Sequence, residues 1–92
     1  MINRSNRERH AEVCEDLNEL YFEKNTRYGN SFSELYQEMG MDYAVPRLYE
    51  KVKRLMVLTR EDLDSLDESI EDSLMDLANY SIMTLMELRG RD

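Results

Sequence analysis

The chain has 92 residues, a formal net charge of -8 and one cysteine. This length fits a single domain with one modest core. The acidic charge argues against long DNA or RNA as a partner, because proteins that bind a nucleic-acid backbone are normally basic. One cysteine excludes an intrachain disulfide. No apolar run approaches the roughly 18 residues of a membrane span, and no signal-peptide core follows the N-terminus. We therefore expect a cytoplasmic protein without a membrane partner.

The first predicted element is a helix over about 5–26. Its apolar residues recur at the 3.6-residue spacing of a helix and are Val13, Cys14, Leu17, Leu20 and Tyr21. This pattern predicts that Cys14 is a core residue. His10 has no second histidine or cysteine nearby, so we expect it at the surface.

A turn is predicted next, because Gly29 and Asn30 both tolerate positive φ. The turn region combines a cation, an amide and a phenol ring, from Lys24, Asn25 and Tyr28. The following helix start adds backbone N–H groups that can bind an anion. Two interpretations stay open: a nucleotide site in which Tyr28 stacks on a base, and a structural turn anchored by Tyr28 and Phe32.

Two further helices are predicted over about 32–39 and 43–58. Ser31 and Glu34 have capping-box spacing, and Gly40 would end the short helix. Pro46 is tolerated in a first helical turn. The longer helix carries an apolar stripe made of Val45, Leu48, Tyr49, Val52, Leu55 and Met56.

The opposite face of the 43–58 helix carries charged residues, which are Arg47, Glu50, Lys51 and Arg54. The cations could bind phosphate oxygens, with arginine in bidentate fashion, and Glu50 could act as a metal ligand. The alternative is a surface ladder of ion pairs, because Glu50 and Arg54 have the favourable i,i+4 orientation.

The last predicted helix covers about 66–88, with Ser65 and Glu68 at capping-box spacing after an acidic loop. Its broad apolar side, expected to form the intramolecular core, consists of Ile70, Leu74, Leu77, Ala78, Ser81, Leu85 and Leu88. Strand signals are absent. The expected fold is therefore one all-α domain over 1–92, a bundle of three long helices and one short helix, with its core at about 8–88 and a frayed tail at 89–92.

The other side of this helix carries an acidic row. Glu68, Asp72 and Asp76 follow one another at i,i+4, where like charges cost roughly 0.2–0.5 kcal/mol per pair. Converging carboxylates suit Mg²⁺, whereas a solvated acidic face is the alternative. Asn79 lies on the same side, which is flanked by Met75, Ile82, Met83 and Met86. A helix that is apolar nearly all round is usually buried on more than one side. We therefore expect a homo-oligomer, a dimer or higher, that forms through this Met-rich surface. The alternative is that the methionines fill gaps in the core of one chain.

Three motifs in this order carry a family resemblance: Lys24–Phe32, Arg47–Leu55 and Glu68–Tyr80. Together they resemble the nucleotide modification associated domain 1 family, which is common in phages and distantly similar to MazG-like all-α nucleoside triphosphate pyrophosphohydrolases. The resemblance covers about 8–88. It implies a MazG-like helical fold, an oligomer, a nucleotide ligand and, for a phage protein, a location in the host cytoplasm.

The resemblance also implies Mg²⁺ held by one carboxylate pair on each of two helices. Glu68 and Asp72 match one pair, but Lys53 stands three residues after Glu50, where a second acid is expected. Asp76 could replace that acid. The candidate catalytic and metal-binding residues are thus Glu50, Glu68, Asp72 and Asp76. The candidate nucleotide- or phosphate-binding residues are Lys24, Asn25, Tyr28, Arg47, Lys51, Arg54 and Asn79.

Three functions follow as hypotheses. The first is a Mg²⁺-dependent pyrophosphohydrolase, in which the metal activates water and the cations stabilise phosphoryl charge. The second is a non-catalytic, cofactor-free binder that sequesters a nucleotide or a nucleotide-derived immune signal, an anti-defence role; the missing acid favours it. The third is a structural protein that docks a partner helix. The base, the phosphate number and the oligomer size stay open.

Overall fold

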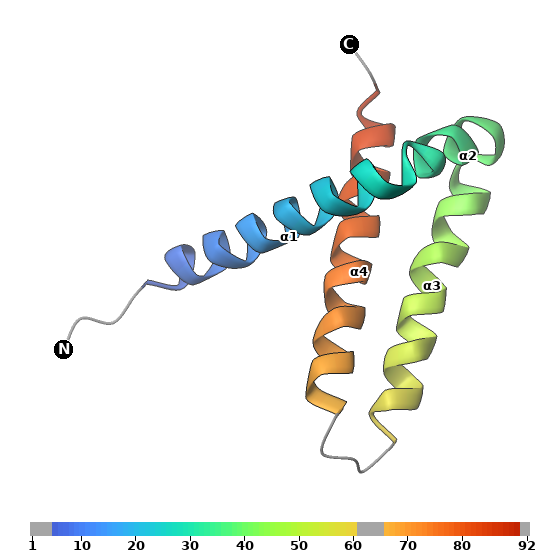
Figure 1. Cartoon of the computed structure of the whole chain (residues 1–92). Coiled ribbons are helices and arrows are strands. Elements are labelled where there is room, and N and C mark those ends of the chain that lie inside the picture. Colours follow the sequence, from blue (N-terminus) through green and yellow to red (C-terminus); the bar gives the residue numbers. More distant parts are fainter. Residues whose placement is uncertain (1–4, 61–65, 91–92) are drawn as a thin grey trace.

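The computed structural model describes residues 5–60 and 66–90, with the side chains of 66–68 outside that description. In this part of the chain there are four α-helices and no strand (Figure 1). They are α1 (Asn6–Tyr28), α2 (Ser31–Met39), α3 (Met41–Leu58) and α4 (Leu66–Leu88). The predicted all-α class is confirmed, and α4 has the predicted bounds.

Helix α1 is fixed at both ends by local chemistry. Ser5 caps its start in a capping box with Glu8, a signal that the sequence analysis overlooked. Gly29, with φ 73°, ends it and donates its N–H to the Asn25 carbonyl over 2.8 Å. The helix therefore runs two residues past the predicted Thr26. Tyr28 is held on the same rigid element as Lys24 instead of lying in a turn.

Glycine also sets the junction between α2 and α3. Gly40, with φ 61°, follows the last residue of α2 and directly precedes α3, so α3 begins two residues before the predicted Tyr43. The predicted Ser31 capping box is wrong, because Asn30 is the N-cap and makes no side-chain capping bond. Ser31 is already helical there. The predicted Ser65 cap lies outside the described residues.

The helices form an antiparallel pair with a third helix across it. Figure 1 shows α3 and α4 side by side, α2 linking α1 to the start of α3, and α1 crossing α4 near its C-terminal end. The N-terminal half of α1 extends away from the other helices. Cys14 is therefore exposed, and its predicted core position is wrong, whereas His10 is exposed as predicted. None of the described helices is both long and apolar enough to span a membrane.

The buried side of α4 differs from the predicted one. Ser73 and Thr84 are buried, whereas Leu74, Leu85 and Leu88, expected in the core, are 49–57% exposed. Both buried side chains are small, and Thr84 Oγ1 donates to the Tyr80 carbonyl over 2.7 Å. Such a bond satisfies a buried hydroxyl inside its own helix. The predicted side is thus only partly correct, because Ile70, Leu77, Ala78 and Ser81 on it are half-buried.

Candidate functional site

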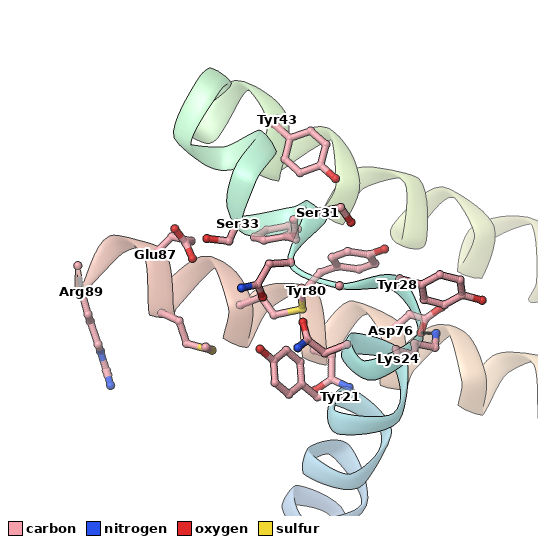
Figure 2. A pocket seen from close by; sticks show the side chains of 18 residues that line it. Tyr21, Lys24, Tyr28, Ser31, Ser33, Tyr43, Asp76, Tyr80, Glu87 and Arg89 are labelled. Carbon is pink, nitrogen blue, oxygen red and sulfur yellow. Dashed lines mark hydrogen bonds and ion pairs between the residues drawn. The ribbon is translucent and has the colours of Figure 1, made fainter. Parts of the chain in front are cut away.

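A pocket of about 650 Å³ opens where the end of α1, the start of α2 and the C-terminal half of α4 meet (Figure 2). Four phenol rings line it, those of Tyr21, Tyr28, Tyr43 and Tyr80. In Figure 2, Lys24 and Asp76 lie together at one end and Arg89 lies at the other. The site is therefore rich in aromatic surface, and its charges are grouped at its ends.

One wall of the pocket is a single face of α1. Tyr21, Lys24, Asn25 and Tyr28 all line the pocket, and their i, i+3, i+4 and i+7 spacing places them on adjacent turns of one helical face. Tyr28 is 64% exposed, so much of its ring is open to a ligand. Because Gly29 ends the helix directly after Tyr28, the chain can turn and bring α2 to the same cavity.

The start of α2 forms a second wall. Residues 30–33 line the pocket, and the Asn30 side chain does not cap the helix. The first N–H groups of a helix have no intrahelical partner and lie at the positive end of its dipole. The Ser31 and Ser33 hydroxyls lie beside them. This wall therefore offers donors suited to an anionic oxygen.

Two lysines hold Asp76 at one end of the pocket. Lys24 Nζ lies 2.8 Å from Asp76 Oδ1, and Lys51 Nζ lies 3.3 Å from Oδ2. Partial burial favours the neutral acid, but the hydrogen bond and charge of Lys24, with the charge of Lys51, outweigh it and lower the pKa of Asp76. The hydrogen bond to Asp76 in turn raises the pKa of Lys24. Both shifts favour the charged forms of Asp76 and Lys24.

An aromatic cluster anchors the floor of the pocket. The buried Phe32 ring lies 5.4 Å from the Tyr43 ring and 5.7 Å from the Tyr80 ring, measured between centroids. The cluster therefore joins α2, α3 and α4. Asn79 is also buried and donates to the Leu17 carbonyl over 3.1 Å, which joins α4 to α1. These contacts fix the walls of the pocket relative to one another.

The pocket brings together five of the predicted site residues: Lys24, Asn25, Tyr28, Asp76 and Asn79. Lys51 reaches the same place through its ion pair with Asp76. Arg47 lies over the Tyr43 ring, 5.4 Å from its centroid, and does not line the pocket; neither does the exposed Arg54. The cations of the predicted basic face of α3 therefore do not act together: Lys51 pairs with Asp76, Arg47 lies over Tyr43, and Arg54 is exposed.

The predicted metal ligands are not gathered in the same way. Glu50 pairs with Arg47 over 3.1 Å, Asp72 is exposed, and the Glu68 side chain lies outside the described part of the chain. Among the described residues, no group of three acidic, histidine or cysteine side chains could hold a metal. Both oxygens of Asp76 face ammonium groups. In this arrangement the described carboxylates do not fit Mg²⁺, and the metal site stays a prediction.

Sequence reasoning missed several pocket residues. Tyr21 could have been found, because it shares the helical face of Lys24 and Tyr28, but it was assigned to the apolar stripe. Tyr43 and Arg89 reach the pocket only through the packing of α3 and α4, which no local pattern encodes.

The fold and pocket define an all-α protein with an aromatic cavity, an open helix start and one lysine-held carboxylate. The family model for nucleotide modification associated domain 1 matches residues 24–88, more than half of the chain, and the chain belongs to this family. The match begins at Lys24 and includes most of the pocket. No curated protein and no solved structure matches the chain significantly.

Proposed function

We propose that the protein binds a nucleotide in this pocket and holds it without turnover. The observation that carries the proposal is that one cavity joins four phenol rings, of which that of Tyr28 is mostly exposed, with an uncapped helix start and Lys24. Stacking of a base on an aromatic ring contributes about 1–3 kcal/mol and tolerates any base. Helix N–H groups and Lys24 would bind a phosphate. Membership of a nucleotide modification associated family supports the same ligand class.

The charges of the pocket favour a ligand with few negative charges. Its charged lining residues are Lys24 and Arg89 against Asp76 and Glu87, two of each sign. A triphosphate would bring several negative charges to a cavity that has no excess of cations. A monophosphate or a phosphodiester brings fewer and would still find Lys24 and the start of α2. This balance supports capture of such a nucleotide over binding of a nucleoside triphosphate.

Turnover fits the described side chains less well than binding. For Asp76 to hold Mg²⁺ it would have to give up its contacts with both Lys24 and Lys51. The family is described as associated with nucleotide modification, which favours an enzyme. We therefore retain a Mg²⁺-dependent pyrophosphohydrolase as the alternative function. For a phage-encoded protein, simple capture would remove a nucleotide-derived immune signal of the host. If the chain forms an oligomer, the number of chains in it would determine how many nucleotide molecules each oligomer binds.

The test is incubation of the protein with a pool of nucleotides and nucleotide signals, with and without Mg²⁺. The protein is then separated and denatured, and both fractions are analysed by mass spectrometry. We expect an intact nucleotide that appears only after denaturation, equally with and without Mg²⁺. A monophosphate and pyrophosphate formed only with Mg²⁺ would establish the hydrolase instead. Absence of any retained or altered nucleotide would leave the helix-docking role.

A matched pair of variants ties the result to the pocket. Tyr28 and Phe22 are aromatic residues of α1 with the same exposure, 64%, but only Tyr28 lines the pocket. Tyr28→Ala should lose retained nucleotide, and Phe22→Ala should keep it. Equal retention by both variants would place the ligand elsewhere.

A further inference from the structure

The side of α3 that faces away from α1 and α2 is apolar and uncovered. Val45, Tyr49 and Val52 recur at i, i+4 and i+7, so they form one stripe along the helix. They are between 39% and 59% exposed. A stripe of this kind normally packs against another element. In the described part of the chain the Lys53 ammonium lies 5.8 Å from the Tyr49 ring centroid, and all three side chains of the stripe stay exposed.

Helix α4 carries a second stripe, formed by Leu74, Leu85 and Leu88, which are 49–57% exposed. These residues belong to the side that the sequence predicted as intramolecular core. The side predicted to meet a second copy lies instead toward α1 and the pocket, since Asn79 bonds to α1 and Met83 lines the cavity. Part of the predicted core side of α4 is therefore exposed, and part of its Met-rich side lies at the pocket, while Ile82 and Met86 of that side are 43% and 47% exposed.

The two stripes lie on the same side of the α3–α4 pair. Val45 follows the buried Ala44, and Leu74 follows the buried Ser73, so each stripe is about 100° from its contact line in the same rotational sense. Because α3 and α4 run in opposite directions (Figure 1), equal rotations turn both stripes toward one face. We call this surface of Val45, Tyr49, Val52, Leu74, Leu85 and Leu88 the hairpin face.

A single chain buries little apolar surface, which favours a partner that covers the hairpin face. Among the described residues, its buried hydrophobic side chains are Leu17, Phe32 and Ala44. A compact chain of 11.0 kDa exposes about 5,600 Å², but this one exposes 7545 Å². The excess of roughly 1,900 Å² exceeds the about 800 Å² that each partner buries in a standard interface, although the extended half of α1 contributes part of it.

We propose that the hairpin face binds the hairpin face of a second copy of this chain, so that α3 and α4 of both copies form a four-helix bundle. Four-helix bundles commonly bury apolar stripes in this way, with two helix pairs facing each other across the core. The six residues of the face carry no charge, so two copies of a chain with net charge -8 can meet there without opposing acids. A second copy is also present wherever the chain is made.

This interface would leave the pocket open, because α1 and α2 lie on the other side of the α3–α4 pair. The inference therefore goes beyond nucleotide binding and does not depend on it. Loss of nucleotide in a pocket variant would not change the assembly, and the assembly can be measured without any ligand. Failure of one proposal is distinguishable from failure of the other.

The first test is the mass of the full chain in solution by light scattering over a range of concentrations. We expect twice the chain mass or an even multiple, a fall to the monomer mass for Val52→Glu, and the wild-type mass for the control Val13→Glu. Val13 is likewise exposed, at 52%, but lies on the outlying half of α1. A wild-type monomer at all concentrations, or a wild-type mass for Val52→Glu, would overturn the proposal.

A second test does not require a charged substitution. In a Cys14→Ser background, Val52→Cys and Val13→Cys are labelled with a thiol reagent under native conditions. We expect the thiol at 52 to react at least about tenfold more slowly, because it reacts only when the interface opens. Equal labelling rates at the two positions would show that the hairpin face is free and would refute the interface.

Discussion

The two sides of α4 are built on different principles. Toward α1 and α2 it presents specific partners: Asn79 bonds to the Leu17 carbonyl, Asp76 pairs with two lysines, and Tyr80 lies near Phe32. Toward the hairpin face it presents only apolar area, such as Leu74 and Leu85. The pocket side is therefore held by directional contacts within one chain, whereas the other side is the one that we propose a second copy covers.

This difference determines how substitutions on the two sides should act. On the pocket side, removal of one group leaves its partner unsatisfied, and the effect is local and depends on pH or ligand. On the hairpin face the effect should depend on protein concentration, because it acts through association. The same helix thus allows a direct comparison between directional contacts on its pocket side and apolar burial on its hairpin face.

The largest effect on the pocket side is expected from Phe32→Ala. This ring is buried between Tyr43 and Tyr80 and holds α2 against α3 and α4. Deletion of a buried phenylalanine typically costs about 3–5 kcal/mol. Denaturant unfolding at one fixed protein concentration should show this loss, whereas Phe22→Ala, which removes an exposed ring, should change stability by less than about 0.5 kcal/mol. Equal losses would mean that the cluster does not anchor the pocket.

On the hairpin face, Leu85→Asp should produce a comparable but concentration-dependent loss. A newly introduced carboxylate that is buried without a partner costs several kcal/mol. The melting temperature of the wild type should rise with protein concentration, and that of the variant should not. If the melting temperature of the wild type does not change with protein concentration, the hairpin face does not act through association.

Tyr28→Ala should weaken nucleotide binding with little change in folding. Its ring is mostly exposed, so it contributes little to stability, but stacking on a base is worth about 1–3 kcal/mol. Calorimetric titration with the nucleotide recovered from the wild type should show the corresponding loss, roughly tenfold or more. Unchanged affinity together with unchanged stability would mean that the base stacks on another ring of the pocket.

Asp76→Asn should have a smaller effect that depends on pH. The pKa of Asp76 lies below its ordinary value of 3.8, so its stabilising contribution is present above pH 3.8 and is lost as the pH falls through the lower folded pKa. The raised pKa of Lys24 acts in the opposite range: its contribution is present below the ordinary value of 10.5 and is lost as the pH rises through the folded pKa. At neutral pH we expect a loss of about 1 kcal/mol, since the pair is partly exposed.

The measurement is unfolding of wild type and Asp76→Asn between pH 2 and pH 11. The difference between them should be greatest in the middle of this range and shrink toward both ends. Addition of Mg²⁺ separates the two views of Asp76: a metal ligand would give the wild type extra stability that the variant lacks. We expect no such extra stability while both lysines hold the carboxylate.

The helices themselves were predictable, because their ends are marked locally. Gly29 and Gly40 both end helices at positive φ, and the spacing of apolar residues gave four helices within a few positions of those observed. Near the end of α1, Lys24, Asn25 and Tyr28 were found because a cation, an amide and a phenol ring gather before the predicted turn, although the helix in fact continues through Tyr28. Local signals of this kind do not depend on how the helices pack.

The packing of the helices was not predictable in the same way. The helical wheel of α4 ranks its sides by hydrophobicity, but among its most buried side chains are the small polar ones of Ser73 and Thr84. Leu74, Leu85 and Leu88 on the apolar side stay exposed in the single chain, and a single sequence does not reveal what would cover them. For the same reason Tyr43 and Arg89 were missed in the pocket: packing, and not pattern, brings them there.

Cys14 tests the outlying half of α1 and should give the smallest effect of all. Its helical spacing predicted a core residue, yet it is exposed and its Sγ lies 3.6 Å from His10 Nδ1 on the next turn. Cys14→Ser should therefore change stability by less than about 0.5 kcal/mol, and the wild-type thiol should label rapidly under native conditions. Slow labelling of Cys14, or a loss of more than about 2 kcal/mol on substitution, would mean that a partner chain covers this half of α1 as well. The assembly would then extend beyond the four-helix bundle of α3 and α4.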